Sequence, residues 1–444
     1  MKNENLIQDK IYQSFLEYLK QDITDLEILL GFSGGLDSSV LLHLLSQMQA
    51  KLNFKLKVIH VHHGLSSSAD DWLNFCKEKC KSLEIEFHAV RVKINNKSSL
   101  GIEGEARELR YRAIKKMQKG IVVLGHHQND QVETLMLQLF RGSGLKGLSG
   151  MSEFDAKRKF WRPMLNIKKD LLEMYAKENN IEFIEDESNQ DIYFDRNFMR
   201  QKVLPLIESR YPAVIETISR SVSNISEGHH LNELVALDDS KNLMSDDGSF
   251  LLINDLKKMP KIRAINLIRW WLSFNDLLMP SRKNIDELYK QILCMKKDSS
   301  LNLKISHEQS IRTHNNKLFI VNLNINSSNF DLKWSGQEEL YLPNKTKLQF
   351  KKIKEGGLSL SKLGIKTLNI KSRMGGEKLK PFSDQPSRSL KYLFQSADIP
   401  LWERGQIPLV FAKDQLVAVP NLAIHHKYQS SKGEEGYQIN WLRD

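Results

Sequence analysis

One short run of residues has the composition of a phosphate-binding turn. It reads Ser33-Gly34-Gly35-Leu36-Asp37-Ser38 and follows the apolar run at residues 28–32. Adjacent glycines let backbone N–H groups close around an anion, serines add hydroxyl donors, and a helix that starts here adds the positive end of its dipole. Because its glycines are adjacent and no lysine follows them, the run is not a Walker A loop. It predicts a phosphate cradle, and a glycine-rich turn that serine merely caps is the alternative.

A second run, Gly125–Thr134, also leaves a predicted strand and enters a predicted helix. Asp130 and Glu133 are three residues apart on that helix, so they share a face. Together with Asp37 at the same sheet edge, these carboxylates could bind a cation, either Mg²⁺ or the ammonium group of an amino acid. An aspartate at a helix start is often only a cap, which is the alternative for Asp130.

Three histidines, His60, His62 and His63, stand together where another predicted strand ends. Open α/β sheets bind ligands at the carboxyl ends of their strands. No cysteine or acidic residue has the spacing that a zinc site with these histidines would need. We therefore expect nucleotide or substrate contacts, or simple packing at the sheet edge, with His63 as the candidate contact residue.

The cysteines give no sign of a metal or redox centre. Cys76 and Cys80 are four residues apart in a predicted helix, and Cys294 is far away in the sequence. Three cysteines in a chain of 444 residues cannot form a disulfide framework. We expect ordinary thiols, buried or on the surface, in a reducing compartment.

The candidate residues need a sheet edge to bring them together, and residues 1–203 are patterned for one. Short apolar runs alternate with longer amphipathic stretches, which is typical of a parallel sheet covered by helices. The predicted strands cover residues 28–32, 56–61, 86–92, 121–125 and 182–184, and the predicted helices cover residues 38–49, 69–83, 103–118, 130–140 and 168–179. The expected fold class is α/β, with a doubly wound parallel sheet at the N-terminus.

Two further domains are predicted after this sheet. From Leu204 the apolar spacing turns helical, and the alternation of strands returns at residues 301–306 and 318–322. The polar stretch at residues 324–329 predicts a linker, and turn-rich sequence with short strands follows it. We expect a phosphate-binding α/β domain at residues 1–203, a mostly helical middle domain at 204–325 and a small α+β C-terminal domain at 326–444.

The chain is basic, with 65 lysines and arginines against 54 acidic residues and a formal net charge of +11. Such a surface attracts a polyanion such as nucleic acid, and a membrane surface is the weaker alternative. Between residues 371 and 413, eight basic residues stand against four acidic ones, with Tyr392, Phe394 and Trp402 among them. This mixture suits RNA, but it also suits a solvated face over a small core.

No apolar run approaches the roughly 18 residues that cross a bilayer, and the N-terminus lacks the apolar core of a signal peptide. We expect a cytoplasmic protein with no membrane partner and no stable protein partner.

The order strand, SGGxDS, helix resembles the phosphate loop of the ATP pyrophosphatases, the PP-loop superfamily. These enzymes cleave ATP between its α and β phosphates and adenylate an oxygen of a second substrate. The resemblance implies that ATP is bound by Ser33, Gly34, Gly35, Leu36, Asp37 and Ser38, and that Asp37 also holds Mg²⁺.

A longer run narrows the resemblance. Residues 125–151, GHHQNDQVETLMLQLFRGSGLKGLSGM, are similar to the second signature of the tRNA(Ile)-lysidine synthase family, which runs roughly HxxDDQxET followed by RGSG. Four further segments agree with that family, at residues 60–66, 102–111, 185–200 and 389–410. The resemblance covers almost the whole chain, including a C-terminal domain that other pyrophosphatase families lack.

This resemblance implies a reaction and its residues. Family enzymes convert the wobble cytidine of the CAU anticodon of tRNA(Ile) to lysidine: ATP adenylates the C2 oxygen, and the ε-amine of L-lysine displaces AMP. Asp37 and Asp130 would then lie near Mg²⁺ or the lysine with Glu133, and Arg107 would stabilise charge in the reaction centre. The substrate-binding residues implied are His63, Asp186, Asn189, Arg196 and Asn197. By the same resemblance, residues 1–203 would be the ATP-binding catalytic domain, and the domains at 204–325 and 326–444 would bind the tRNA.

The sequence departs from the family pattern at three positions. Asn129 replaces the first aspartate of the usual pair, so Asp130 is the carboxylate expected at the metal. His62 and Ser66 stand where many members carry asparagine and arginine.

Three rival functions remain. A cytidine thiolase needs paired or active-site cysteines, and this chain has no CxxC and no cysteine is expected near the phosphate loop. A GMP or NAD synthetase acts on a small molecule, which the basic C-terminal domain argues against. From another class, the chain could be a catalytically inactive tRNA-binding protein.

Overall fold

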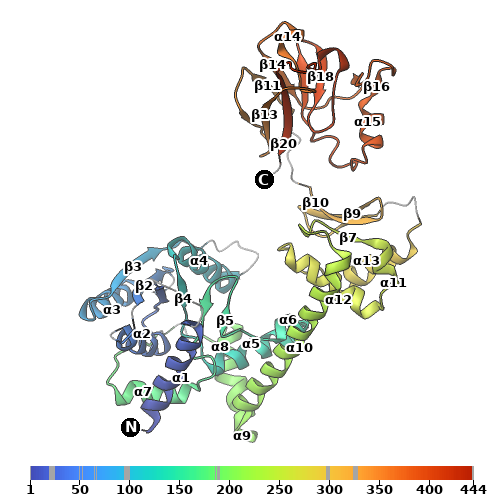
Figure 1. Cartoon of the computed structure of the whole chain (residues 1–444). Coiled ribbons are helices and arrows are strands. Elements are labelled where there is room, and N and C mark those ends of the chain that lie inside the picture. Colours follow the sequence, from blue (N-terminus) through green and yellow to red (C-terminus); the bar gives the residue numbers. More distant parts are fainter. Residues whose placement is uncertain are drawn as a thin grey trace. The chain divides into compact units, whose positions relative to one another are not determined.

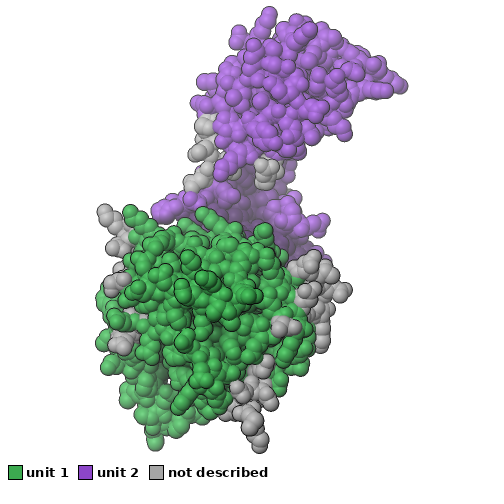
Figure 2. All heavy atoms as spheres, turned by 90° about the vertical axis from the view of Figure 1, so that its left-hand side faces the viewer, with its two compact units in different colours: residues 1–232 green, residues 233–444 purple. Residues whose placement is uncertain are grey.

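The computed structural model describes residues 2–19, 26–49, 51–52, 54–64, 66, 68–94, 101–185, 187, 191–296, 301–323 and 329–442. The chain divides into two units, residues 1–232 and 233–444 (Figure 2). None of the helices in the described ranges is long and apolar enough to cross a membrane.

The described part of unit 1 is built on a six-stranded sheet with the order β3-β2-β1-β4-β6-β5. The first five strands in this order run parallel, and β5 pairs antiparallel with β6. The strands are β1 Leu26–Gly31, β2 Phe54–His62, β3 Glu86–Arg91, β4 Ile121–Val123, β5 Phe154–Asp155 and β6 Phe160–Trp161. The chain order reverses between β1 and β4, and this switch point is where open α/β sheets bind ligands.

Helices cover both faces of this sheet (Figure 1). Successive side chains of a strand point to opposite faces, so each face carries apolar side chains that helices bury. Ile28 and Leu30 of β1 pack in a core with residues of α1, α2, α3 and α7. Leu29, between them, packs with Ile114 of α4 on the opposite face. These helices are α1 Lys2–Leu19, α2 Leu36–Gln49, α3 Ala69–Ser82, α4 Gly101–Met117 and α7 Lys169–Glu178. The prediction of a doubly wound α/β domain is confirmed.

The remaining helices of unit 1 follow β4 and the edge strands. They are α5 Gln128–Phe140, α6 Leu145–Leu148, α8 Asp195–Phe198, the π-helix η2 Met199–Val203 and α9 Leu204–Arg210. The last three are continuous. Pro205, at the start of α9, has no N–H to donate to the carbonyl of Gln201, which interrupts the α-helical pattern at the π-helix.

The strand predicted at residues 182–184 is wrong. This segment is irregular, and Phe183 is exposed. The N–H of Ile184 instead donates to the carbonyl of Gly34 at 2.9 Å, so the segment lies against the turn after β1. The position beside β4 in the sheet is taken by β6, which the sequence analysis did not predict.

The first part of unit 2 places helices on an antiparallel sheet with the order β7-β10-β9-β8. Trp271, Leu288 and Ile311 lie in its core. Its elements are α10 Val214–Leu243, which begins in unit 1, then β7 Phe250–Leu252, α11 Ile253–Lys258, α12 Lys261–Phe274, α13 Arg282–Cys294, β8 Asn302–Lys304, β9 Gln309–His314 and β10 Lys317–Asn322. The mostly helical character predicted here is confirmed. Of the linker predicted at 324–329, residues 324–328 lie outside the described residues.

Residues 329–442 are rich in strands, in agreement with the predicted α+β class. One sheet has the order β11-β14-β17-β18-β19 and another β12-β13-β20, and Trp334 stacks on Phe350 between them, with ring centroids 4.5 Å apart. The elements are β11 Asp331–Trp334, β12 Glu339–Tyr341, β13 Lys347–Ile353, α14 Leu360–Leu363, β14 Leu368–Lys371, β15 Lys378–Leu379, β16 Arg388–Ser389, α15 Leu390–Ser396, β17 Leu409–Ala412, β18 Gln415–Val419, β19 Ala423–Ile424, η3 His426–Tyr428 and β20 Gly436–Leu442.

Candidate active site

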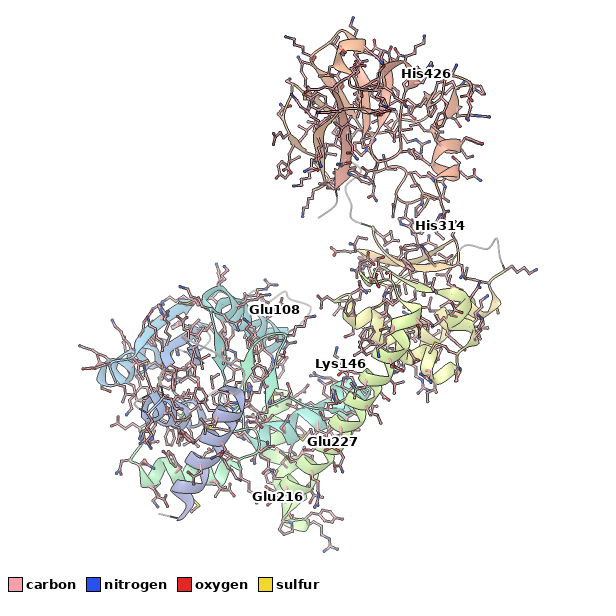
Figure 3. The ribbon with its side chains drawn as sticks, in the orientation of Figure 1. Glu108, Lys146, Glu216, Glu227, His314 and His426 are labelled. Atoms are coloured by element: carbon pink, nitrogen blue, oxygen red, sulfur yellow. The ribbon has the colours of Figure 1, made fainter. Side chains whose placement is uncertain are left out.

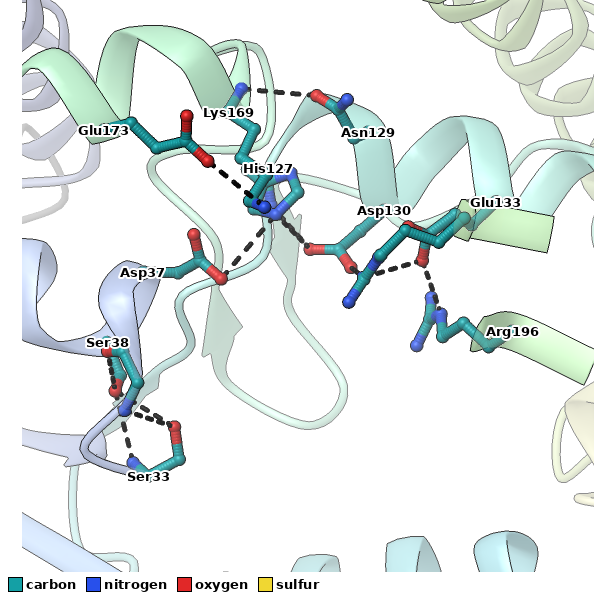
Figure 4. A network of polar contacts seen from close by, with 12 residues as sticks. Ser33, Asp37, Ser38, His127, Asn129, Asp130, Glu133, Lys169, Glu173 and Arg196 are labelled. Atoms are coloured by element: carbon teal, nitrogen blue, oxygen red, sulfur yellow. Dashed lines mark hydrogen bonds and ion pairs between the residues drawn. The ribbon is translucent and has the colours of Figure 1, made fainter. Parts of the chain in front are cut away.

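The turn between β1 and α2 has the geometry of an anion cradle. The hydroxyl oxygens of Ser33 and Ser38 lie 3.1 Å apart, and the N–H of Gly35 donates to Oγ of Ser33 at 3.3 Å (Figure 4). Ser38 lies in the first turn of α2, where free N–H groups and the helix dipole favour an anion. The turn therefore offers hydroxyl and backbone donors to a phosphate group.

Two glycines are required by the close packing around this turn. Gly34 has a φ of +88°, and a Cβ there would lie 3.0 Å from Sγ of Cys76 and 3.1 Å from Cδ1 of Ile184. A Cβ on Gly125 would lie 3.2 Å from the carbonyl carbon of Asp37. Gly125 thus lets the chain after β4 come close to the phosphate turn.

His127 lies between two of the predicted carboxylates. Its Nε2 is 3.7 Å from Oδ2 of Asp37 and 3.6 Å from Oδ2 of Asp130 (Figure 4). Asp130 also accepts a hydrogen bond from the backbone N–H of His127 at 3.0 Å, which caps α5. Asp130 therefore caps α5, as the alternative interpretation predicted, and also lies close to His127.

Glu133 is fully buried, and both of its carboxylate oxygens meet arginines. Nε and Nη2 of Arg200 donate to Oε1 and Oε2 at 2.6 and 3.0 Å. Nε of Arg196 lies 2.9 Å from Oε2, and its Nη2 donates to Oγ1 of Thr134 at 3.0 Å. Arg200 also reaches Oδ1 of Asp130 at 3.4 Å. We call Asp130, Glu133, Arg196 and Arg200 the Glu133 network.

The pKa values of the two aspartates shift in opposite directions. Burial raises the pKa of Asp37, although the neighbouring His127 opposes this, and its Oδ1 is buried without a hydrogen-bond partner in the described part of the chain. Burial would also raise the pKa of Asp130, but the neighbouring His127, His126 and Arg196 and the hydrogen bond from the His127 N–H together hold it below its usual value. Asp130 is thus ionised, and Asp37 has an oxygen available for a ligand.

These two carboxylates fit Mg²⁺ only as partial ligands. The described residues include no group of three or more His, Cys, Asp or Glu side chains that could hold a metal ion. Mg²⁺ is commonly bound by one or two carboxylates together with substrate phosphates and water. The unpartnered Oδ1 of Asp37, beside the phosphate turn, is compatible with that arrangement.

Lys169 supplies a positive charge that the phosphate turn itself lacks. It begins α7, and its charge lowers the pKa of Asp37. Its backbone N–H donates to Oδ1 of Asn129 at 3.2 Å (Figure 4). Asn129, which replaces an aspartate of the family pattern, thus binds the start of α7.

Of the three histidines at the end of β2, His60 and His62 hold the sheet edge, and His63 is the predicted substrate-contact residue. Nδ1 of His60 donates to the carbonyl of Phe32 at 2.9 Å, and Nε2 of His62 lies 3.3 Å from Asp70, so both hold the sheet edge. Burial lowers the pKa of His63 to about 4, and it lowers the pKa of His126 to about 3. Both imidazoles are therefore neutral at neutral pH.

The remaining predicted site residues, Arg107, Asn197, Asp186 and Asn189, do not all join the carboxylate cluster. The guanidinium of Arg107 lies 5.3 Å from the ring centroid of Tyr111, and its charge acts on His126. Nδ2 of Asn197 donates to the carbonyl of Asp191 at 2.9 Å, within its own loop. Asp186 and Asn189 lie outside the described residues.

Sequence reasoning missed three residues of this cluster, His127, Lys169 and Arg200. Arg200 stands four residues after Arg196 in a helical segment, and that spacing was the available signal. Nothing in the sequence indicated its partner Glu133, 67 positions earlier.

The expectation that no cysteine lies near the phosphate turn is wrong, although Cys76 is far from the turn in the sequence. Cys76 packs behind Gly34, because α3 covers the same face of the sheet. Cys76 and Cys80 are both buried, and burial raises the pKa of each to about 12. Neither is a thiolate at neutral pH, so both behave as the ordinary thiols expected.

The three aromatic residues of the basic C-terminal stretch have different environments. Phe394 is fully buried in the core, and Trp402 packs against Phe319 with centroids 5.6 Å apart. Tyr392 is half exposed, with the guanidinium of Arg388 4.9 Å from its ring centroid. Of these three, Tyr392 offers the open ring.

Three family models match successive parts of the chain. Residues 7–207 match a PP-loop domain, residues 251–319 a TilS substrate binding domain, and residues 368–441 a TilS substrate C-terminal domain.

Curated relatives match nearly the whole length. A tRNA(Ile)-lysidine synthase of Nitrosomonas europaea is 35% identical over 417 residues, which are 92% of this chain and 90% of the relative. That of Coxiella burnetii is 32% identical over 435 residues, 96% of each chain. Among solved structures, the U34-tRNA thiolase NcsA from Methanococcus maripaludis, 17% identical, covers 50% of this chain and 78% of its own with a TM-score of 0.43, too low to assign a function. The matches to curated relatives show that the chain belongs to the tRNA(Ile)-lysidine synthase family of PP-loop enzymes.

Proposed function

We propose that the protein ligates L-lysine to C2 of the wobble cytidine of the CAU anticodon of tRNA(Ile), forming lysidine while ATP goes to AMP and diphosphate. One observation carries the proposal: the loops after β1 and β4 place Asp37 and Asp130 on either side of His127 beside a phosphate cradle. A nucleotide bound there would present its phosphates to both carboxylates at the switch point of the sheet.

In the first step the C2 oxygen of the cytidine attacks the α-phosphorus of ATP, and diphosphate leaves. Ser33, Ser38 and the N–H groups of the turn bind the phosphates. Asp37 and Asp130 would hold Mg²⁺, which when bound neutralises phosphate charge. Lys169 adds a fixed positive charge on the same side, because it already acts on Asp37.

In the second step the ε-amine of lysine attacks C2, AMP leaves with the C2 oxygen, and the amine loses its protons. Asp130 is ionised and attracts the ammonium group, and the Glu133 network fixes its position. His126 is neutral, and its buried Nδ1 has no hydrogen-bond partner in the described structure, so it can accept one from the amine. Arg107, whose charge reaches His126, would stabilise the anionic leaving group.

The test is transfer of labelled lysine to tRNA(Ile) with a CAU anticodon, with methionine tRNA bearing the same anticodon as control. We expect one AMP released per lysine incorporated into tRNA(Ile), and no label in the methionine tRNA. Incorporation of sulfur from a sulfide donor would favour a thiolase, which the high pKa of Cys76 and Cys80 argues against. Binding of tRNA without AMP release would identify an inactive tRNA-binding protein.

A further inference from the structure

Unit 1 exposes three aromatic rings on the segments that carry the Glu133 network. Phe140, which ends α5, is 67% exposed, Tyr193 is 83% exposed, and Phe198, which ends α8, is 47% exposed. Rings of this size normally contribute to a core, and grouped exposed apolar side chains often mark a binding surface. We call Phe140, Tyr193 and Phe198 the aromatic rim.

Two contacts tie the aromatic rim to the candidate active site. Arg196, two residues before Phe198, reaches back to Glu133 and Thr134 of α5 at 2.9 and 3.0 Å (Figure 4). Arg141, the residue after Phe140, pairs with Asp195 at 3.8 Å. The end of α5 therefore lies beside α8, and the aromatic rim is carried by the same segments as the Glu133 network.

The loop that carries Tyr193 is held in shape by its own hydrogen bonds. The N–H of Tyr193 donates to Oδ1 of Asp191 at 2.9 Å, and Asn197 donates to the carbonyl of Asp191 at 2.9 Å. The ring of Tyr193 packs edge-on against Phe194, with centroids 5.8 Å apart. Because the backbone is already shaped, less conformational entropy is lost when a ligand stacks on the ring.

The groups around the rim favour RNA as its partner. Arg141 directly follows Phe140 in the sequence, Lys146 (labelled in Figure 3) comes five residues later, and both side chains are exposed. A Cβ on Gly142 or Gly144 would meet no atom within 4 Å, so the turn between these two cations is open on its outer side. Planar rings next to exposed cations suit unpaired nucleotides, because bases stack on the rings while phosphates pair with the cations.

We propose that the aromatic rim binds the unpaired nucleotides on either side of the reactive cytidine, by stacking of their bases on Phe140, Tyr193 and Phe198. The inference rests on the proposed function. A loop cytidine can reach Asp37 and Asp130 only after it leaves the stack of its neighbours, and unstacking costs free energy. The rim supplies new stacking partners to those neighbours and so offsets that cost.

The experiment measures the affinity of the full-length protein for a tRNA(Ile) transcript with a CAU anticodon, without ATP or lysine. Phe140→Leu, Tyr193→Leu and Phe198→Leu keep apolar bulk and remove the π face. Loss of one base–aromatic stack should weaken binding about fivefold to a hundredfold. Tyr193→Phe keeps the ring and should bind as wild type, as should Tyr211→Leu, which removes a ring of unit 1 that is 63% exposed outside the rim.

Transcripts that lack one base next to the reactive cytidine separate stacking from other effects. Each rim variant should lose less than about twofold in affinity for the transcript that lacks the base stacked on the replaced ring. On that transcript the ring has no base to stack on even in the wild-type protein. Unchanged affinity in all three rim variants, or an equal penalty on every abasic transcript, would overturn the proposal. So would a rim variant that alters only self-association in sedimentation velocity, since the rim would then join copies of the chain.

The outcome is separable from that of the proposed function. If wild-type protein transfers no lysine while the rim variants still lose RNA affinity in the base-dependent way, the proposed function fails and the rim remains an RNA-binding surface. If wild-type protein transfers lysine and the rim variants bind all transcripts normally, the rim proposal alone fails.

Discussion

Nε of Arg200 donates to Oε1 of Glu133 at 2.6 Å, although the two residues are 67 positions apart in the sequence. The arginine lies in the π-helix η2, a type of turn that is often found at functional sites. Because Glu133 is fully buried and Arg196 meets its other oxygen, the charge of Glu133 is used within the protein. Its expected role is to orient the arginines and, through Arg200, Asp130.

Glu133→Gln should therefore damage both stability and lysine use. Two partly buried arginines would lose their anionic partner in the fully buried Glu133, which typically costs about 2 to 5 kcal/mol. We expect a lower free energy of unfolding in denaturant titrations, and a higher lysine requirement with little change in tRNA affinity.

Glu86→Gln is the matched control for that variant. Glu86 pairs with Lys55 at 3.1 Å on the surface, and such pairs contribute at most about 1 kcal/mol. Wild-type stability and wild-type lysine dependence in Glu133→Gln would show that the network has neither role.

Gly34→Ala and Gly35→Ala should differ sharply. At Gly34 an alanine needs a left-handed backbone, which costs roughly 1–2 kcal/mol, and its Cβ would also crowd Cys76 and Ile184. At Gly35 the new Cβ would meet Oγ of Ser33 at 3.5 Å, an ordinary contact. Thermal melts should show a clear loss for the first variant and little for the second. Equal melting temperatures would contradict the conformation described for the turn.

Asp37→Asn and Asp130→Asn should change stability in opposite directions at neutral pH. The pKa of Asp37 is raised, so ionisation of Asp37 destabilises the fold by its full amount above the raised pKa, and this cost declines as pH falls from the raised value to the ordinary one. The pKa of Asp130 is lowered, so its ionised form stabilises the fold above its ordinary pKa, and this is lost as pH falls through the lowered value. Asp37→Asn should melt at the same or a higher temperature while AMP release is lost, and Asp130→Asn should melt lower. A lower melting temperature for Asp37→Asn would show that burial is not the main cause of its shift.

His127→Asn should shift the acid limb of the pH–activity profile to higher pH. His127 opposes the effect of burial on Asp37, so its removal should raise the pKa of Asp37 further. If an ionised Asp37 is needed, AMP release should begin to fall at a higher pH than in wild type. An acid limb at an unchanged or lower pH would mean that another group limits the rate.

Much of unit 1 could be predicted from short-range patterns. Apolar runs and helical spacing identified β1–β4 and their helices within a few residues, because each element buries one face or stripe of its own side chains. The run Ser33–Ser38 and the pair Asp130 and Glu133 were identified in the same way, since a turn and a helix face depend on neighbours in sequence.

The strand predicted at residues 182–184 shows the limit of this reasoning. Its apolar pattern suits a strand, but a strand also needs a free sheet edge, and β6 occupies the place beside β4. The backbone of Ile184 instead donates to Gly34, and no local pattern could indicate that bond.

The sequence by itself determined the chemical groups at the candidate site: a glycine-serine turn, two aspartates, a glutamate and the order of strands that brings them to one sheet edge. Only the tertiary structure decided how these groups are used. It placed His127 between Asp37 and Asp130, buried Glu133 against Arg196 and Arg200, and left Phe140, Tyr193 and Phe198 exposed on the same segments. The physical reason is that charge pairing and burial depend on distances between segments far apart in the chain, whereas a turn or a helix is set by residues that are close in sequence.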